Sequence, residues 1–374
     1  MKILFIVPYP TEGASNRHRV EQYLPYLKQE RIQAAVSPFL FKRFFRILYQ
    51  PGHGVEKGVY FVVACLRRLL DLYRGLRSDL IFVHREACPV GPPLFEWCLW
   101  LMRKPIVFDF DDAIFLPDSN ILSPGLRFLK CPWKVRHIIR MSRAVIVANP
   151  YLADYARRYH DCVHVIPTVV DTDRIRVKES EPAAENGSPV IGWIGTGSTT
   201  SYLGSVLPIL EKLGRRYCFK LRIIGSSREI DLPGVPVENC RWSFEEERNL
   251  SDKMDIGIYP LPDNAWARGK AAFKAIQYMA AGLPVVASPV GMTAEVVRDG
   301  VNGFLAATDE EWFQKLSLLI EQPQLRRRLG RMGRRMAEER YALHRYQAHF
   351  LDILKGVFEE TQDMEKSSLR LRKK

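Results

Sequence analysis

The feature that most constrains the fold is a regular alternation of short apolar runs with amphipathic helical patterns. In the first half, strand-like runs occupy residues 2–8, 34–39, 80–84, 105–110, 144–149 and 163–168. In the second half, they occupy 190–195, 219–225, 255–260 and 283–288, with shorter candidates at 235–239 and 303–307. Helices of the second half are expected at roughly 201–214, 244–252, 270–281 and 309–320. Alternation of this kind is typical of parallel sheets, so the chain is predicted to be α/β, with two Rossmann-like domains facing a central cleft.

The boundary between the two series is a polar stretch without apolar periodicity, residues 172–189. Its proline, glycine and asparagine content predicts a linker. The first domain is then 1–171 and the second 190–340. The basic end of the chain, 363–374, is expected to be a disordered tail.

The charge of the chain narrows its partners. A formal net charge of +13 favours an anionic partner such as nucleic acid, anionic lipid or a phosphorylated small molecule. No nucleic-acid-binding signature is present, so nucleic acid is not expected. The seven cysteines are dispersed without metal-ligand spacing, which indicates a reducing compartment and no metal site. No apolar run reaches the ~18 residues of a membrane span. The chain is therefore expected to be cytoplasmic, or peripheral at the inner face of the membrane.

The stretch RGKAAFKAIQYMAAGLPVV, residues 268–286, is predicted to begin as a helix with an unusual start. Arg268, Lys270 and Lys274 crowd its N-terminal end, where the helix dipole disfavours cations. A bound anion such as a phosphate would balance them, and Gly269 would allow close backbone approach. Gln277, two turns further on, could hydrogen-bond a ribose hydroxyl. The alternative is a solvated basic face.

A second phosphate-binding candidate is GWIGTGSTTSYL, residues 192–203. It predicts a strand, a turn and a helix, and the turn consists of Gly195, Thr196, Gly197 and Ser198. The turn lacks the lysine of a P-loop and the third glycine of a dinucleotide fingerprint. It is either a phosphate cradle or simply a turn between strand and helix. Both candidates follow strands of the second domain, so one ligand could touch both.

The longest distinctive segment, KAIQYMAAGLPVVASPVGMTAEVVRDGVNGFL (274–305), resembles the group 1 retaining glycosyltransferases, family four, of the GT-B fold. The resemblance extends to 310–320, 325–341, 142–159, 165–175 and the first strand. It implies that the final helix, 341–362, crosses back to the first domain. It also implies transfer of a sugar from a nucleotide-diphosphate donor held mainly by the second domain. The diphosphate is stabilised by basic side chains and a helix N-terminus, so no metal and no cofactor are implied.

The sequence departs from the family pattern at three places. The family's two glutamates across this helix are replaced by Gly269 and Gln277, which puts the donor-sugar contacts in question. The turn GTGSTTSYL lacks the family's arginine and lysine, and we infer that Arg268, Lys270 and Lys274 supply this charge. Third, the family's histidine near the end of a first-domain strand corresponds to VFDFDDAIF, 107–115.

The acidic residues of that last segment are the catalytic candidates. Asp109, Asp111 and Asp112 end a predicted strand, and Asp111 or Asp112 could accept a proton from the acceptor or stabilise positive charge on the donor sugar. Crowded carboxylates are expected to raise one another's pKa, which suits a base. The alternatives are a metal site and a structural cap of the next turn.

The acceptor is expected on the first domain. Arg17 and Arg19 are predicted to lie at a helix N-terminus after the first strand. His84, Arg85 and Glu86 follow another strand, and Arg85 could contact a carboxylate or phosphate of the acceptor. Alternatively, Arg85 and Glu86 pair with neighbouring side chains.

Segment 39–49, FLFKRFFRILY, interleaves aromatic and basic residues. Together with RRLLDLYRGLR, residues 67–77, and the basic tail it could contact an anionic membrane. The alternative is that these segments are core-facing helices with a solvated face. The leading function is a retaining, metal-independent glycosyltransferase with a glycan or lipid-linked acceptor, in cell-surface polysaccharide or glycolipid assembly. The alternatives are a non-catalytic nucleotide-sugar or glycan-binding scaffold and a basic peripheral membrane adaptor.

Overall fold

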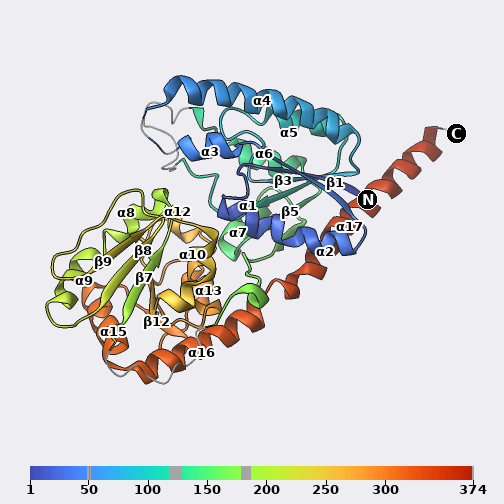
Figure 1. Cartoon of the computed structure of the whole chain (residues 1–374). Coiled ribbons are helices and arrows are strands. Elements are labelled where there is room, and N and C mark those ends of the chain that lie inside the picture. Colours follow the sequence, from blue (N-terminus) through green and yellow to red (C-terminus); the bar gives the residue numbers. More distant parts are fainter. Residues whose placement is uncertain (49, 51, 118–128, 178–186, 373–374) are drawn as a thin grey trace. The chain divides into compact units, whose positions relative to one another are not determined.

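The computed structural model describes residues 1–48, 50, 52–117, 129–177 and 187–372 (Figure 1). The chain divides into two compact units, Met1–Thr168 with His344–Lys374, and Val169–Leu343. Each unit contains one six-stranded sheet, and every strand pair is parallel. This confirms the predicted α/β class with two Rossmann-like units.

The sheet of the first unit has the order β2-β1-β3-β4-β5-β6. Its strands are β1 (Lys2–Val7), β2 (Gln33–Pro38), β3 (Leu80–His84), β4 (Ile106–Phe110), β5 (Ala144–Val147) and β6 (Val163–Val165). Strands β3, β4 and β5 are buried along their whole length, because helices cover the sheet. These helices are α1 (Ala14–Arg19), α2 (Leu24–Gln29), α3 (Lys42–Leu48), α4 (Gly54–Leu76), α5 (Leu94–Leu101), α6 (Lys134–Met141), α7 (Pro150–Arg157) and α17 (His344–Arg372).

The sheet of the second unit has the order β12-β11-β10-β7-β8-β9. Its strands are β7 (Val190–Ile194), β8 (Lys220–Ile224), β9 (Val237–Cys240), β10 (Ile256–Tyr259), β11 (Val285–Ala287) and β12 (Gly303–Leu305). Its helices are α8 (Thr200–Leu203), α9 (Leu207–Gly214), α10 (Phe244–Arg248), α11 (Leu250–Lys253), α12 (Ala265–Arg268), α13 (Phe273–Ala280), α14 (Thr293–Val296), α15 (Asp309–Glu321) and α16 (Pro323–Arg340). In both units each predicted strand is present, within three residues of its expected ends.

Three predicted helices of the second unit differ from expectation: two are divided, and one begins later. The helix expected at 201–214 breaks after Gly204 into α8 and α9, and Pro208 lies in the first turn of α9. The helix expected at 244–252 divides into α10 and α11 at Asn249. The helix expected at 270–281 begins only at Phe273, because Ala272 has a left-handed backbone with φ of 50°. Local backbone geometry, which hydrophobic periodicity does not report, sets these ends.

The final helix α17 belongs to the first unit, as the family resemblance implied. Phe350 lies on the ring of Tyr23, with ring centroids 4.3 Å apart, and also contacts Phe82 at 5.5 Å. The helix continues to Arg372, so residues 363–372 are helical rather than disordered as expected. Leucine, arginine, lysine and glutamate, which are frequent here, favour helix. Residues 373–374 of the expected tail and 178–186 of the expected linker lie outside the described residues.

The segment proposed for membrane contact, 39–49, packs inward. Phe39, Leu40 and Phe44 are buried, and they form a core cluster with Ala64 and Cys88. The structure therefore favours the core-facing alternative for residues 39–48, and Tyr49 lies outside the described residues.

Candidate functional site

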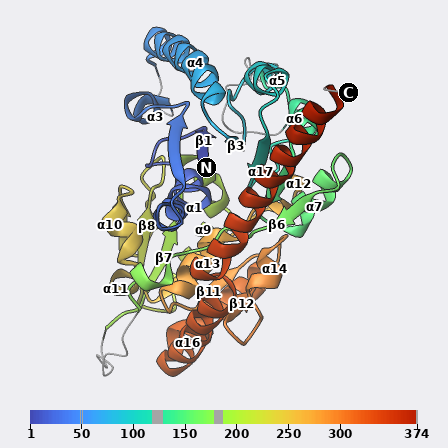
Figure 2. The same ribbon diagram turned by 90° about the vertical axis from the view of Figure 1, so that its right-hand side faces the viewer.

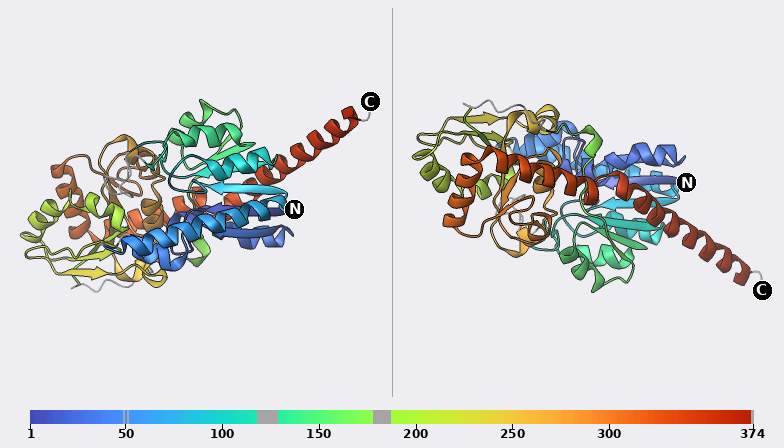
Figure 3. Two further views of the ribbon diagram at one scale, coloured as in Figure 1. Left: turned by 90° about the horizontal axis from the view of Figure 1, so that it is seen from above. Right: turned by 90° about the horizontal axis from the view of Figure 1, so that it is seen from below.

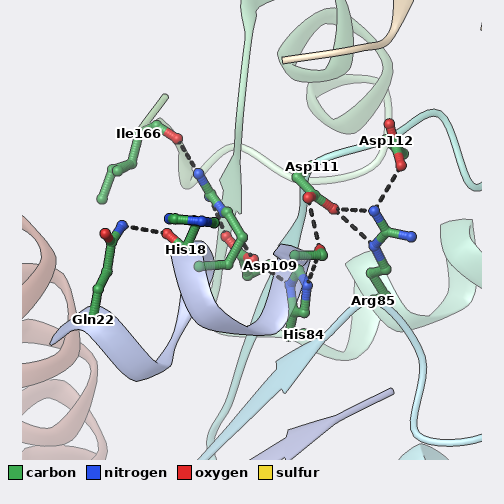
Figure 4. A network of polar contacts seen from close by, with 10 residues as sticks. His18, Gln22, His84, Arg85, Asp109, Asp111, Asp112 and Ile166 are labelled. Carbon is green, nitrogen blue, oxygen red and sulfur yellow. Dashed lines mark hydrogen bonds and ion pairs between the residues drawn. The ribbon is translucent and has the colours of Figure 1, made fainter. Parts of the chain in front are cut away.

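Charged and polar side chains of the first unit meet at the carboxyl ends of β3 and β4 (Figure 4). We call this group the β3–β4 cluster; it consists of Ser15, Arg19, His84, Arg85, Asp109, Asp111 and Asp112. Neighbouring parallel strands bring their ends to the same sheet edge, and residues His84 and Asp109 are register partners there. The cluster thus unites both catalytic candidates with Arg19, His84 and Arg85 of the predicted acceptor side.

One half of the cluster is a buried chain from Arg19 to Ser15. The Arg19 guanidinium forms an ion pair with Asp109, and Arg19 also donates to the backbone oxygen of Ile166. His84 Nδ1 lies 2.6 Å from Asp109 Oδ2, and His84 Nε2 lies 2.6 Å from Ser15 Oγ. Ser15 Oγ in turn donates to Asp111 Oδ2 at 2.7 Å. Sequence reasoning missed this role of Ser15.

Hydrogen bonds connect Ser15 and His84 to the two aspartates. The hydroxyl of Ser15 has one proton, and it points to the Asp111 carboxylate. His84 bridges the hydroxyl and the other carboxylate, with Nε2 facing Ser15 Oγ and Nδ1 facing Asp109 Oδ2. The imidazole ring and the serine hydroxyl thus connect Asp109 and Asp111 through hydrogen bonds.

Arg85 holds the other half of the cluster. Its Nε donates to Asp111 Oδ1 at 2.7 Å, and its Nη2 lies 2.6 Å from Asp112 Oδ2. The backbone of Arg85 has φ of 60°, a left-handed conformation that is costly for a residue with a side chain. The ion pairs and a bond from Arg85 N to Asp109 O, 2.7 Å, stabilise this conformation. Arg85 thus pairs with neighbours, which was the alternative to acceptor contact.

The expected rise in carboxylate pKa is wrong for Asp109 and Asp111. Burial does raise the pKa of Asp109, but the charge of Arg19 and the hydrogen bond and charge of His84 lower it by more, so its pKa lies below the ordinary value. Burial likewise raises the pKa of Asp111, but Arg85, His84 and Arg19 lower it well below the ordinary value. Both carboxylates remain ionised, which suits stabilisation of positive charge better than proton abstraction.

The remaining acceptor-side candidates lie near the cluster. Arg17, His18 and Arg19 occupy the last turn of α1, where cations are favourable, so the predicted N-terminal position of Arg17 and Arg19 is wrong. The Arg17 guanidinium donates to the backbone oxygens of Thr11 and Glu12, at 3.2 and 3.4 Å. Glu86 is buried, with Oε1 3.5 Å from Lys134 Nζ.

In the second unit, the turn after β7 is held by hydrogen bonds between its own residues. Thr196 N donates to Thr199 Oγ1 at 3.0 Å, and Thr199 N donates to Thr196 O at 2.9 Å, around a 3₁₀ turn at Gly197–Thr199. Gly195 precedes it, and a Cβ at this position would lie 1.9 Å from the Trp193 ring. The turn can therefore lie against the buried indole only because residue 195 is a glycine.

Lys274 connects this turn to α13. Its Nζ donates to Thr199 Oγ1 at 3.0 Å and lies 5.0 Å from the centre of the Trp193 ring. The two phosphate-binding candidates of the sequence are thus adjacent in the structure. Lys270 lies between α12 and α13, 5.6 Å and 5.9 Å from the rings of Trp266 and Tyr202.

The predicted position of Arg268 at a helix start is wrong. Arg268 ends the short helix α12, where a cation is favourable, and its Nε lies 2.7 Å from Asp263 Oδ1. Gly269 caps α12 and is buried. Of the three cations that the sequence placed at one helix start, only Lys274 lies in the first turn of α13.

Helix α13 is fixed to β7 by Tyr278. Its buried hydroxyl accepts a hydrogen bond from Ile194 N at 2.9 Å. Its ring occupies the space that a side chain at Gly257 would fill, since a Cβ there would lie 2.4 Å from the ring. This anchor sets the position of Lys274 relative to the turn.

The ribose candidate Gln277 has a partner that sequence reasoning missed. Gln277 Nε2 donates to Glu247 Oε1 at 3.0 Å, and Trp242 Nε1 donates to Glu247 Oε2 at 2.8 Å. Ser243 caps α10 and thereby fixes the start of the Glu245–Glu247 run. The three successive glutamates were the available signal, although only the fold indicates which of them turns toward Gln277.

Two kinds of feature are absent from the described part of the chain. No group of three or more His, Cys, Asp or Glu side chains there could hold a metal ion. None of the helices described is long and apolar enough to cross a membrane.

Comparison with known proteins gives the class of this fold and site. A family model described as "Glycosyltransferase Family 4" matches residues 14–174, and one described as "Glycosyl transferases group 1" matches residues 188–322. The two matches together cover most of the chain, one in each unit. The chain belongs to the group 1 glycosyltransferases, and its fold is GT-B.

Solved structures support the fold over nearly the whole chain. Sucrose-phosphate synthase from Thermosynechococcus elongatus is similar with a TM-score of 0.66 and 15% identity, covering 96% of this chain and 100% of that one. The Anabaena HepE protein, solved in complex with UDP-glucose, gives a TM-score of 0.67 and 16% identity, covering 95% and 100%. A glycosyltransferase from Rickettsia africae gives 0.66 and 15%, covering 95% and 98%.

One curated relative shares a short segment. Spore coat protein SA of Bacillus subtilis is 32% identical over 78 residues, which are 20% of this chain and 21% of that protein. The match thus spans about a fifth of the relative's length.

Proposed function

We propose that this chain is a retaining glycosyltransferase that moves a sugar from a nucleotide-diphosphate donor to a glycan or lipid-linked acceptor. The observation that carries the proposal is the contact of Lys274 with Thr199, which joins the glycine-rich turn to the start of α13. Helix N-termini and cations bind diphosphate, and they stabilise the charge that develops on it as the sugar leaves. Solved proteins of the same fold include one in complex with UDP-glucose and one with UDP and a glycosylated glycerol.

The donor site consists of the turn Gly195–Ser198 with Lys270 and Lys274. Arg268 and Gly269 border it at the end of α12. Gln277 and Glu247 then face the ribose, where a carboxylate accepts hydrogen bonds from two vicinal hydroxyls. Basic side chains and backbone N–H groups supply the positive charge, so the reaction is proposed to proceed without a metal.

The β3–β4 cluster provides the first unit's contribution to this proposal. Asp111 and Asp112 are the catalytic candidates, and their ionised state suits stabilisation of positive charge on the donor sugar. The acceptor is proposed to enter beside Arg17, His84, Arg85 and Glu86. The role is proposed to lie in cell-surface polysaccharide or glycolipid assembly, in the cytoplasm; all seven cysteines are free thiols, which fits a reducing compartment.

The test is a calorimetric titration of the protein with a panel of nucleoside diphosphates, in buffer containing a chelator. One diphosphate is expected to bind, and Lys274→Ala is expected to weaken binding by roughly tenfold, the size of one lost charge-assisted contact. Lys212→Ala, an exposed lysine of α9, is the matched control. Absence of binding to every diphosphate would reject the proposed donor site.

A second candidate function is a non-catalytic nucleotide-sugar binder. It is favoured by Gly269 and Gln277, which stand where the family carries two glutamates. Release of free sugar or transfer to an acceptor from the sugar form of the bound nucleotide would exclude it. The anomeric configuration of the product, read by nuclear magnetic resonance, tests retention.

A further inference from the structure

Helix α4 buries a charged pair against the sheet and exposes a long row of apolar side chains. Arg68 and Asp71 are buried together with Ala64 and Gly75. Tyr60 and Phe61 are half-buried against the core, but most large apolar side chains of the helix are exposed. The exposed ones are Val55, Val59, Val62, Val63, Leu66, Leu69, Leu70, Tyr73 and Leu76. A helix of a water-soluble domain ordinarily has the opposite arrangement.

The buried pair fixes this orientation. Arg68 donates to the backbone oxygens of Val7, Ser37 and Ala87 at 2.7, 2.9 and 2.8 Å, and to Asp71 Oδ2 at 2.8 Å. Every contact lies on the sheet side of α4. Rotating the helix to bury its leucines would remove the three hydrogen bonds from Arg68 to these backbone oxygens, which is unfavourable for buried groups. The outward apolar face is therefore built into the fold.

Close packing adds to the same restraint. A Cβ at Gly75 would lie 2.8 Å from Leu99 Cδ2 of α5, so the two helices are in close contact at this point. Helix α5 lies beside α4 (Figure 2), and it too exposes Leu94, Trp100 and Leu101. We call the exposed apolar residues of both helices the α4–α5 face. Figure 3 shows α4 uncovered along its length when the molecule is seen from above.

The charges around the α4–α5 face are mostly positive. Helices α3, α4 and α5 are described completely, and their exposed or half-buried cations are Lys42, Arg43, Arg46, Lys57, Arg67 and Arg74. Arg77 follows α4, with its guanidinium 4.5 Å from the Tyr73 ring. Glu56 is the one carboxylate of these three helices that is not buried; Asp71 and Glu96 are inside.

This pattern distinguishes between possible occupants. The apolar residues from 55 to 76 alternate in steps of four and three, as in a coiled coil, but Val63 and Leu70 widen the stripe where a coiled coil carries charges. A second copy of the chain would also bring cations against cations. A wide apolar face with leucines and a tryptophan, bordered by arginine and lysine, matches the boundary of an anionic bilayer.

We propose that the α4–α5 face binds the surface of a membrane that contains anionic lipids, with α4 parallel to the bilayer plane. Helix α4 has 23 residues and is about 35 Å long, so it would lie in the headgroup region as a monotopic contact. This assignment replaces segment 39–49, whose aromatic residues from Phe39 to Phe45 pack in the core cluster. It is independent of the proposed transferase activity.

The test is flotation of the full chain with vesicles of phosphatidylcholine alone and of phosphatidylcholine with phosphatidylglycerol, at low and high salt. The wild type is expected to float with the anionic vesicles and less at high salt, because salt screens the arginines. Leu66→Glu with Leu70→Glu is expected to reduce binding at least about tenfold, since two apolar contacts are lost and two like charges are added. Both residues are more than half exposed, so folding is retained.

A control variant distinguishes loss of the α4–α5 face from a general effect of added negative charge. Leu318→Glu, on α15 of the second unit, should float like the wild type, and nucleoside diphosphate binding should be unchanged in all three proteins. Flotation that the Leu66 and Leu70 substitutions leave unaltered would overturn the proposal. So would a wild type that binds neither vesicle; a dimer in solution that the same substitutions dissociate would then identify a second copy as the occupant.

Discussion

At the scale of the residue, Arg85 is the centre of the β3–β4 cluster. It bears a left-handed backbone and pairs with two aspartates, so its removal takes the paired cation away from the buried Asp111 and from Asp112. We expect Arg85→Met to lower the free energy of unfolding by about 3–5 kcal/mol near neutral pH. Urea unfolding measures this loss.

The pH dependence of that loss identifies its cause. In the wild type the pKa of Asp111 is lowered, so this group stabilises the fold above its unfolded pKa, and the contribution is lost as the pH falls through the folded pKa. In Arg85→Met, burial dominates and raises the pKa of Asp111. Lowering the pH therefore stabilises the folded variant relative to its unfolded state. The difference from wild type should therefore shrink between about pH 7 and about pH 4. Arg17→Met, whose guanidinium donates to backbone oxygens, should show no such trend.

Glu247 offers a second test at this scale. If its carboxylate accepts from the ribose, Glu247→Gln should weaken nucleoside diphosphate binding by about tenfold. Inorganic diphosphate, which has no ribose, should bind both proteins equally. Glu245→Gln, an exposed neighbour on α10, is the control. Equal loss for both ligands would mean that Glu247 acts on the structure of the site and not on the sugar.

At the scale of the element, the turn after β7 depends on Gly195. A Cβ there would collide with the Trp193 ring, which also lies beneath Lys274. Gly195→Ala should destabilise the protein by about 1–3 kcal/mol, the usual result of overpacking, and should weaken diphosphate binding. Thermal unfolding and titration measure the two effects. Gly356→Ala on α17 has open space around it and should lose neither stability nor binding.

The strands were predictable because each is a continuous apolar run that the sheet buries on both faces. The start of α13 was not, because the left-handed Ala272 carries no signal of its own in the sequence. The same holds for the site. That polar residues gather at strand ends follows from parallel topology, but the pairing of Arg85 with Asp111 depends on side-chain direction. The pKa prediction failed for this reason, since the arginines were known but their partners were not.

At the scale of the whole molecule, α17 links the end of the chain to the first unit. Phe350 is buried against Tyr23 and Phe82. Phe350→Ala should lower the free energy of unfolding of the first unit by about 3–5 kcal/mol. Calorimetry should show one part of the unfolding profile moving to lower temperature while the part stabilised by a bound diphosphate stays in place. Met364→Ala, half exposed on the same helix, should leave both parts unchanged.

The Tyr278 anchor has a consequence for how this sequence can diverge. The phenol ring takes the volume that any side chain at position 257 would need, and its hydroxyl holds the end of β7. A larger residue at 257 is therefore tolerable only together with a smaller one at 278, and that change frees the Ile194 amide. In an alignment of descendants, positions 257 and 278 should covary, and lineages that lose the tyrosine should be those that recognise their donor differently.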